Sequence, residues 1–336
     1  MPEPGRGAGM RHRLLGRSGM RVSELCLGTM TFGSGGRTAG ADEDACRAIY
    51  AAYRAAGGNF VDTADVYSGG ESETIVGGLI AAERDEVVVA TKFALPTGDD
   101  ANSGGAHRKS MRRSVETSLR RLGTDHVDLL WVHAWDQGTP AEETLRGLDD
   151  LVRSGKVLSI GVSNTPAWVV ARSQAIAELR GWSAFCALQV EYSLAARTAE
   201  RELLPMAASL GLAVTGWSPL ARGLLAGKEP GARARALYPA LQRAVDAAAA
   251  VAAEIGTTTA RVALAWLLRR GVLPVLGASR PAQIHDNLGA LDVRLDEEQA
   301  ALLDEAARVD LGYPHDFLHA RCPTLSITLG ELHSRY

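Results

Sequence analysis

The chain has 336 residues, which is enough for one large domain or two smaller ones. Hydrophobic residues make up 46% of it and charged residues 22%, the balance of a globular protein with a full core. The net charge of −3 gives no reason to expect nucleic acid or an anionic membrane as a partner. Four widely spaced cysteines form no CxxC pair, so we expect reduced thiols and no metal site: Cys26, Cys46, Cys186 and Cys322.

The first residues, 1–9, are rich in proline and glycine and lack the apolar segment of a signal peptide. No later stretch reaches the length of a transmembrane helix. We therefore expect a cytoplasmic protein with a disordered tail at 1–10, a single domain at 11–320 and a C-terminal tail at 321–336.

In chain order, residues 14–22 come first, as two apolar arms around a Gly-Arg-Ser-Gly turn, and they predict a β-hairpin. Short apolar runs then alternate with amphipathic stretches. The apolar runs predict eight strands: Glu24–Gly28, Asn59–Asp62, Glu86–Lys92, Val127–His133, Leu158–Val162, Ala184–Gln189, Leu212–Trp217 and Val272–Gly277. The stretches between them predict helices that include Glu43–Ala56, Glu73–Ala82, Lys109–Leu122, Glu142–Ser154, Ala199–Leu210 and Thr258–Arg269.

Local signals mark some of the helix ends. Thr139-Pro-Ala-Glu142 predicts an N-cap threonine, a proline at the first helical position and a capping box. Eight strand-helix units favour a closed (β/α)8 barrel over a doubly wound sheet, and no GxGxxG opens a helix after the first strand. The predicted fold class is therefore α/β, a (β/α)8 TIM barrel with an N-terminal β-hairpin.

Ionisable side chains lie at or just past the ends of three successive predicted strands. Asp62 ends the second strand and Tyr67 follows it, Lys92 ends the third strand, and His133 ends the fourth. The carboxyl ends of barrel strands converge on one face, where the active sites of such barrels lie. These four residues are therefore the predicted catalytic group.

The four residue types suit hydride reduction of a carbonyl, in which the developing alkoxide must be stabilised and protonated. A free tyrosine has a pKa near ~10 and donates poorly at neutral pH unless a positive charge stabilises its phenolate. Lys92 can supply that charge, Asp62 can hold the ammonium in place, and His133 can orient the carbonyl oxygen. Tyr67 is thus the expected general acid.

Each residue alone also has a simpler interpretation. A lysine at a strand end is more often a solvated terminus, and an aspartate there can cap the next helix. A tyrosine in a glycine-rich loop is commonly a surface or lid residue. Their joint placement at the ends of three neighbouring strands favours the catalytic interpretation.

The chain resembles the aldo-keto reductase family in a series of motifs. They are Asp62-Thr-Ala-x-x-Tyr67, Thr91-Lys92, His133 with Asp136, Gly161-Val-Ser-Asn164, Gln189 with Glu191-Tyr192-Ser193, Trp217-Ser-Pro-Leu220, Gly277-Ala-Ser-Arg280 and Gln283-x-x-x-Asn287. Val132-His-Ala-Trp-Asp136 is similar to the branch that includes aryl-alcohol dehydrogenase-like reductases and potassium-channel β-subunits. The resemblance implies that Asp62, Tyr67, Lys92 and His133 form the family's catalytic tetrad.

The resemblance also implies an NADP(H) site. Its contacts fall on Thr29, Ser163, Asn164, Gln189, Trp217, Ser218, Leu220, Gly223, Ser279, Arg280, Gln283 and Asn287. Trp217 offers a flat face to nicotinamide, and Arg280 could pair with a 2′-phosphate. Gln283 stands where the better-known mammalian branch has a second arginine, so the preference for NADP rests on Arg280. The segment 222–241 is short for this branch.

The leading hypothesis is an NADPH-dependent reductase of a hydrophobic, small-molecule aldehyde or ketone. Met30, Phe32, Phe93 and Trp135 are the candidate pocket residues, with Tyr313 or Phe317 as further candidates. A keto-sugar reductase, an NADP-binding regulatory subunit and a phosphate-binding barrel isomerase are the alternatives. A homo-oligomer is left open.

Overall fold

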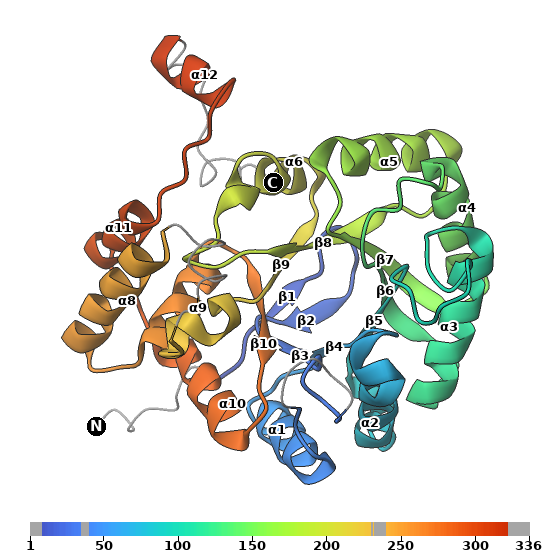
Figure 1. The fold of residues 1–336 in the computed structure, drawn as a ribbon, viewed down its shortest axis with the longest axis horizontal. Coiled ribbons are helices and arrows are strands. Elements are labelled where there is room, and N and C mark those ends of the chain that lie inside the picture. Colours follow the sequence, from blue (N-terminus) through green and yellow to red (C-terminus); the bar gives the residue numbers. More distant parts are fainter. Residues whose placement is uncertain (1–8, 35–39, 230, 232–239, 322–336) are drawn as a thin grey trace.

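Eight parallel strands close into a barrel in the computed structural model, which describes residues 9–34, 40–229, 231 and 240–321 (Figure 1). The strand order around the barrel is β10, β3, β4, β5, β6, β7, β8 and β9, so sequential strands are neighbours and β10 pairs with both β3 and β9. The barrel strands are β3 (Cys26–Gly28), β4 (Phe60–Asp62), β5 (Val88–Phe93), β6 (Val127–Val132), β7 (Val157–Ser163), β8 (Phe185–Glu191), β9 (Ala213–Trp217) and β10 (Leu273–Gly277).

Helices surround the barrel as an outer ring (Figure 1). They are α1 (Glu43–Ala55), α2 (Glu71–Ile80), α3 (Arg108–Leu122), α4 (Ala141–Arg153), α5 (Ala167–Arg180), α6 (Leu203–Leu210), α8 (Leu241–Ile255), α9 (Thr259–Arg269), α10 (Pro281–Leu288) and α11 (Glu297–Ala306). A further helix outside the ring, α12 (His315–Arg321), follows α11 in the chain. The predicted barrel with its hairpin is confirmed, and each of the eight predicted strands overlaps an observed one.

Two local predictions were wrong. Residues 199–210 do not form one helix, because a 3-10 turn at Thr198–Glu200 is followed by α6 from Leu203. Thr139 does not cap α4: the N-cap residue is Pro140, and the Thr139 hydroxyl donates to Asp136 at 2.5 Å instead. A carboxylate three residues earlier in the chain has thus taken the hydroxyl that the capping box would have used.

Alternation along the strands divides the core into two layers. Residues of one parity fill the barrel interior, and they include Phe60, Val88, Ala90, Leu129 and Trp131. Residues of the other parity, which include Val61, Val89, Leu130 and Phe93, pack between the sheet and the helices. Both faces of β4, β5 and β6 are therefore largely buried, which explains the nearly continuous apolar runs of these strands in the sequence.

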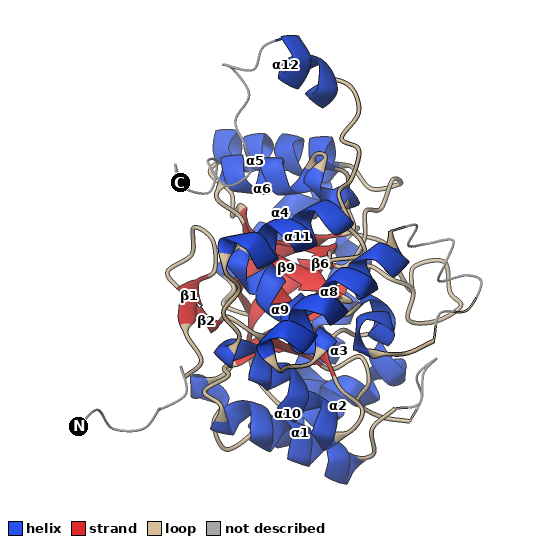
Figure 2. Ribbon diagram, turned by 90° about the vertical axis from the view of Figure 1, so that its left-hand side faces the viewer, coloured by secondary structure: helices blue, strands red, loops and turns tan. Residues whose placement is uncertain are grey.

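The hairpin of β1 (His12–Leu14) and β2 (Arg21–Ser23) lies at one side of the barrel (Figure 2). Leu15 and Val22 are fully buried and belong to the interior cluster. Gly16 has a φ of +58°, and a Cβ there would lie 2.0 Å from the carbonyl oxygen of Cys186 near the start of β8. The hairpin therefore closes the amino-terminal end of the barrel, as predicted.

The helix α12 stands apart from the barrel in both views (Figures 1 and 2). Tyr313 is 87% exposed and Phe317 54% exposed, so neither lines a pocket in this arrangement. Residues 1–8 and 322–336, with Cys322, lie outside the described residues, and Met10 already packs in the outer core. Of the described helices, none is long and apolar enough to span a membrane by itself, although α8 and α9, bent by 100°, pass this test as a pair.

Candidate active site

Strand parity places Asp62, Lys92 and His133 on the barrel axis at the carboxyl ends of β4, β5 and β6. Side chains two positions apart in a strand face the same side. The residues two positions before them all belong to the interior cluster: Phe60, Ala90 and Trp131. The three ionisable side chains therefore point into the mouth of the barrel, directly above its apolar filling.

Lys92 and Asp62 form a buried ion pair. The Lys92 side chain is fully buried and contacts the Asp62 carboxylate, and its ammonium also donates to the carbonyl oxygen of Thr63 at 2.9 Å. The Gln189 amide donates to the other Asp62 oxygen at 3.3 Å. Burial alone would lower the pKa of Lys92, but attraction to Asp62 more than offsets it and the pKa is raised. Lys92 is therefore a permanently charged group.

Tyr67 begins the 3-10 turn η1 (Tyr67–Gly70), which follows β4. The Lys92 ammonium lies 4.8 Å from the centre of its ring, and the ring meets that of His133 edge-on with centroids 6.0 Å apart. Burial raises the pKa of Tyr67, and the charge of Lys92 opposes that rise. The structure thus brings the four predicted catalytic residues together, while their catalytic roles remain a prediction.

His133 is partly buried and carries no charge. Burial, reinforced by the neighbouring Lys92, lowers its pKa to about 3, so the imidazole is neutral at physiological pH. Its Nδ1 atom is buried and finds no hydrogen-bond partner in the described part of the chain. A neutral imidazole can donate one hydrogen bond without adding a second positive charge beside Lys92.

Polar groups at the carboxyl ends of β7 and β9 line the mouth of the barrel next to His133. The Asn164 amide nitrogen donates to the carbonyl oxygen of His133 at 2.8 Å and to the Ser163 hydroxyl at 2.9 Å. The Trp217 indole N–H donates to the Asn164 amide oxygen at 3.3 Å. Asn164 therefore fixes the position of His133 relative to the indole ring.

Backbone strain concentrates at this mouth. In the described chain, all six non-glycine residues with positive φ follow the carboxyl ends of barrel strands: Ser68, Ala94, Asn164, Ser218, Ala221 and Arg222. Such residues cost of order 1–3 kcal/mol each and cluster at functional sites. The sequence analysis had named Asn164 and Ser218 as cofactor contacts, but no sequence signal indicated the strain, because only the backbone angles reveal it.

The remaining predicted cofactor residues lie in three places. Ser218, Leu220 and Gly223 belong to the strained segment after β9. Thr29 follows β3 and is buried, and its hydroxyl donates to the carbonyl oxygen of Asp62 at 3.1 Å. Just before α10 or within it lie Ser279, Arg280, Gln283 and Asn287. Contact of any of these residues with a cofactor remains a prediction.

Gln283, in the first turn of α10, holds the backbone that leads into the helix. Its side-chain oxygen accepts the backbone N–H groups of Ser279 at 2.8 Å and Arg280 at 3.1 Å. Arg280 itself is exposed at the N-cap position, and Asn287 is buried one turn beyond Gln283. The side-chain oxygen of Gln283 therefore fixes the backbone at the start of α10.

The four expected pocket residues are placed differently from one another. Met30 is 55% exposed after β3, and Trp135 follows His133 by two positions. Phe32 and Phe93 are buried in the outer core layer, Phe93 because its parity is opposite to that of Lys92. The predicted role of these four residues in substrate binding stays a prediction.

A cavity of about 330 Å³ lies beside Trp135, between the upper ends of β6 and β7 and the helices α4 and α5. Trp168 of α5 meets Trp135 edge-on at 5.7 Å, and Val132 and Val162 contribute to the apolar lining. The sequence analysis missed Trp168, because a tryptophan in the first turn of an amphipathic helix is usually a packing residue.

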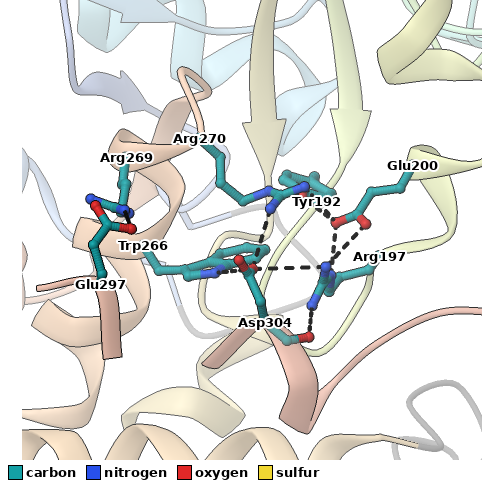
Figure 3. Close-up of polar contacts among 8 residues, drawn as sticks. All are labelled: Tyr192, Arg197, Glu200, Trp266, Arg269, Arg270, Glu297 and Asp304. Carbon is teal, nitrogen blue, oxygen red and sulfur yellow. Dashed lines mark hydrogen bonds and ion pairs between the residues drawn. The ribbon is translucent and has the colours of Figure 1, made fainter. Parts of the chain in front are cut away.

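A second polar cluster, also missed, lies behind Tyr192 (Figure 3). The buried Tyr192 hydroxyl donates to Glu200 at 2.6 Å and accepts from Arg270 at 2.7 Å. The guanidinium groups of Arg197 and Arg270 lie 5.2 and 5.1 Å from the ring of Trp266. The cluster ties the segment after β8 to the end of α9, and Asp304 adds α11 to it (Figure 3).

Tyr192 links this cluster to the site, because its backbone N–H donates to the carbonyl oxygen of Trp217 at 3.4 Å. The cluster consequently supports the segment that carries the indole ring from outside the barrel.

Asp65, between Asp62 and Tyr67, makes stability depend on pH. Burial raises the pKa of its carboxyl from 3.8 to about 7, despite the contact with Ser114. The folded state then keeps a proton that the unfolded state loses near pH 4, so stability falls as the pH rises from about 4 to 7. Asp65→Asn should remove this loss, and its stability relative to wild type should improve by about 2–3 kcal/mol between pH 5 and 8. Denaturant unfolding at the two pH values measures the change, and a pH-independent difference would contradict the assignment.

The chain thus combines a closed barrel of eight parallel strands with a buried lysine-aspartate pair, a tyrosine and a neutral histidine at its carboxyl mouth. This chain belongs to the aldo-keto reductase family, since the family model for "Aldo/keto reductase family" matches residues 24–308.

Relatives support the assignment to this family of enzymes. The chain is 39% identical to a norsolorinic acid reductase of Emericella nidulans, over 94% of this chain and 86% of that protein. It is 37% identical to an aryl-alcohol dehydrogenase of Pestalotiopsis microspora, over 94% and 87%. It is 38% identical to an uncharacterized oxidoreductase of Bacillus subtilis, over 88% and 95%.

Proposed function

We propose that this chain reduces an aldehyde or ketone to an alcohol with NADPH, and that Tyr67 donates the proton. The single observation that carries the proposal is the cluster at the barrel mouth, in which the buried pair of Asp62 and Lys92 meets the partly buried Tyr67 and His133. Barrels host many chemistries, so the fold alone would not support it.

Lys92 makes Tyr67 the better acid. Its ammonium, held by Asp62 and by the carbonyl oxygen of Thr63, places a fixed positive charge beside the tyrosine ring. That charge stabilises the phenolate left after proton transfer and so opposes the effect of burial on the pKa of Tyr67. Such acid catalysis typically contributes roughly 10²–10⁴-fold.

His133 orients the carbonyl. With a pKa of about 3 its imidazole is neutral, so it donates a hydrogen bond to the carbonyl oxygen without competing as a proton source. The contact between the Asn164 amide and the carbonyl oxygen of His133 holds the residue in place. A donor aimed in advance at the developing oxyanion lowers the barrier further.

The rim residues fit a nicotinamide dinucleotide. Trp217 offers a flat ring, and the amide of Asn164 and the hydroxyl of Ser163 supply polar groups beside it. A nicotinamide nucleotide supplies the hydride when it is bound. Arg280, exposed at the amino-terminus of α10, suits a 2′-phosphate and favours NADP over NAD.

A hydrophobic carbonyl compound is the substrate that suits the mouth best. Trp135, Trp168 and the apolar part of the cavity beside them, which includes Val132 and Val162, offer surface to an aromatic or aliphatic group. One relative carries the name of an aryl-alcohol dehydrogenase, which agrees with this class.

The function is tested with the purified chain, NADPH and a panel of aromatic and aliphatic aldehydes and ketones. We expect loss of the near-ultraviolet absorbance of NADPH with at least the aromatic aldehydes. Tight binding of NADPH without turnover of any carbonyl would contradict the proposal.

In the same assay, Arg280→Met should raise the KM for NADPH roughly 10–100-fold, the cost of one charge-assisted contact of about 1.5–3 kcal/mol. The KM for NADH should not change, because NADH has no 2′-phosphate. Arg308→Met, at an arginine that is 75% exposed just past the end of α11 and paired with Glu305, is the control. An equal rise in the KM values for NADPH and NADH would show that Arg280 does not bind the 2′-phosphate.

A further inference from the structure

Arg121, near the end of α3, contacts the loop that carries Tyr67 on both sides of the tyrosine. One guanidinium nitrogen donates to the carbonyl oxygen of Asp65 at 3.0 Å, and another donates to that of Gly69 at 3.3 Å. These carbonyl groups lie two residues before and two residues after Tyr67. One planar side chain thus bridges the two arms of the turn.

The same guanidinium is anchored by a buried carboxylate. Arg121 forms an ion pair with Glu73 at 3.0 Å, and the Glu73 side chain is fully buried. The other Glu73 oxygen accepts the hydroxyl of Thr91 at 2.6 Å. Thr91 immediately precedes Lys92 in β5, so one carboxylate connects the tyrosine loop with the strand of its lysine partner.

The loop needs such support because its backbone is strained. Ser68, Gly69 and Gly70 follow Tyr67 with φ values of 49°, 65° and 100°. The left-handed backbone conformation of Ser68 in particular costs free energy, which contacts with the surrounding structure must offset. A Cβ on Gly70 would lie 2.1 Å from the guanidinium carbon of Arg121, so the glycine allows the side chain to reach the loop.

We propose that Arg121, anchored by Glu73, is a positioning residue that holds Tyr67 at its working distance from Lys92. The inference rests on the proposed function, because it assigns Arg121 a task only if Tyr67 is the acid. Arg121 contacts neither substrate nor cofactor in this account. Its effect comes through geometry, since a displacement of about 1 Å at a reacting group can cost roughly 10²-fold in rate.

The test compares Arg121→Met, Arg121→Lys and the control Arg120→Met with wild type. Arg120 is the exposed neighbour of Arg121, and among the residues that the structure describes its side chain donates to Thr117 on its own helix, at 2.9 Å. Arg121→Met should lower kcat by roughly 10²-fold with the KM for NADPH within about twofold. Arg121→Lys keeps the charge but loses the planar fork, so its kcat should be intermediate. Arg120→Met should match wild type.

A second readout does not depend on activity. Amide hydrogen exchange of residues 65–70 should accelerate at least about tenfold in Arg121→Met, and exchange in β6 should stay unchanged if the barrel remains folded. Unchanged exchange at 65–70 would overturn the inference whether or not a carbonyl is reduced. A kcat for Arg121→Met equal to that of Arg120→Met would also overturn it.

Tyr67→Phe in the same series separates this inference from the proposed function. If Tyr67→Phe keeps full activity, the proposed proton donor is wrong, and the inference that depends on it falls too. If Tyr67→Phe is inactive while Arg121→Met is fully active, only the positioning role is overturned.

Discussion

Replacing Tyr67 with phenylalanine is expected to lower kcat for carbonyl reduction by roughly 10²–10⁴-fold, because the substitution removes the hydroxyl group that protonates the alkoxide. The ring keeps its place beside Lys92 and His133, so fold and cofactor affinity should change little. Steady-state kinetics with NADPH measures kcat, and quenching of protein fluorescence by NADPH measures affinity.

Tyr313→Phe is the matched control for this prediction. Tyr313 is 87% exposed, lies two residues before α12, which stands apart from the barrel (Figure 1), and loses the same hydroxyl. The control should keep the wild-type rate. A Tyr67→Phe variant as active as this control would show that another group protonates the product.

The second large effect concerns the buried ion pair. Asp62→Asn or Lys92→Met alone should destabilise the fold by about 3–5 kcal/mol, because each leaves the partner charge buried without its counter-ion. The double variant should lose clearly less than the sum of the two single losses, since it leaves no uncompensated charge. Denaturant unfolding of all four proteins gives the coupling free energy.

The double variant also separates stability from catalysis. It should be better folded than either single variant yet inactive, since it lacks the charge beside Tyr67. Additive losses in the unfolding cycle would mean that the contact between Lys92 and Asp62 stabilises neither partner.

The barrel and the placement of the catalytic residues could be predicted from the sequence because both follow from local patterns. Each strand is a short apolar run. An ionisable residue at the end of a strand faces the same side as the residue two positions before it, so Lys92 faces the barrel interior as Ala90 does. The motif from Asp62 to Tyr67 added the tyrosine, which no strand pattern could place.

The supporting contacts could not be predicted in this way. Arg121 stands beside Arg120 on an amphipathic helix and looks like a solvated cation, but its partners lie about fifty residues earlier in the chain. Thr139 had a convincing capping pattern, and the Asp136 carboxylate attracted its hydroxyl instead. Phe93 was a candidate pocket residue, and the structure places it in the outer core layer, because adjacent residues of a strand face opposite sides. Its role in substrate binding stays a prediction.

The most direct test of the central claim uses NADPH deuterated at both positions of nicotinamide C4, an aromatic aldehyde and mass spectrometry of the product. The account predicts an alcohol with one deuterium on the former carbonyl carbon, formed by wild type and formed far more slowly by Tyr67→Phe. An alcohol without deuterium, or no alcohol from any carbonyl offered, would contradict hydride transfer at this site.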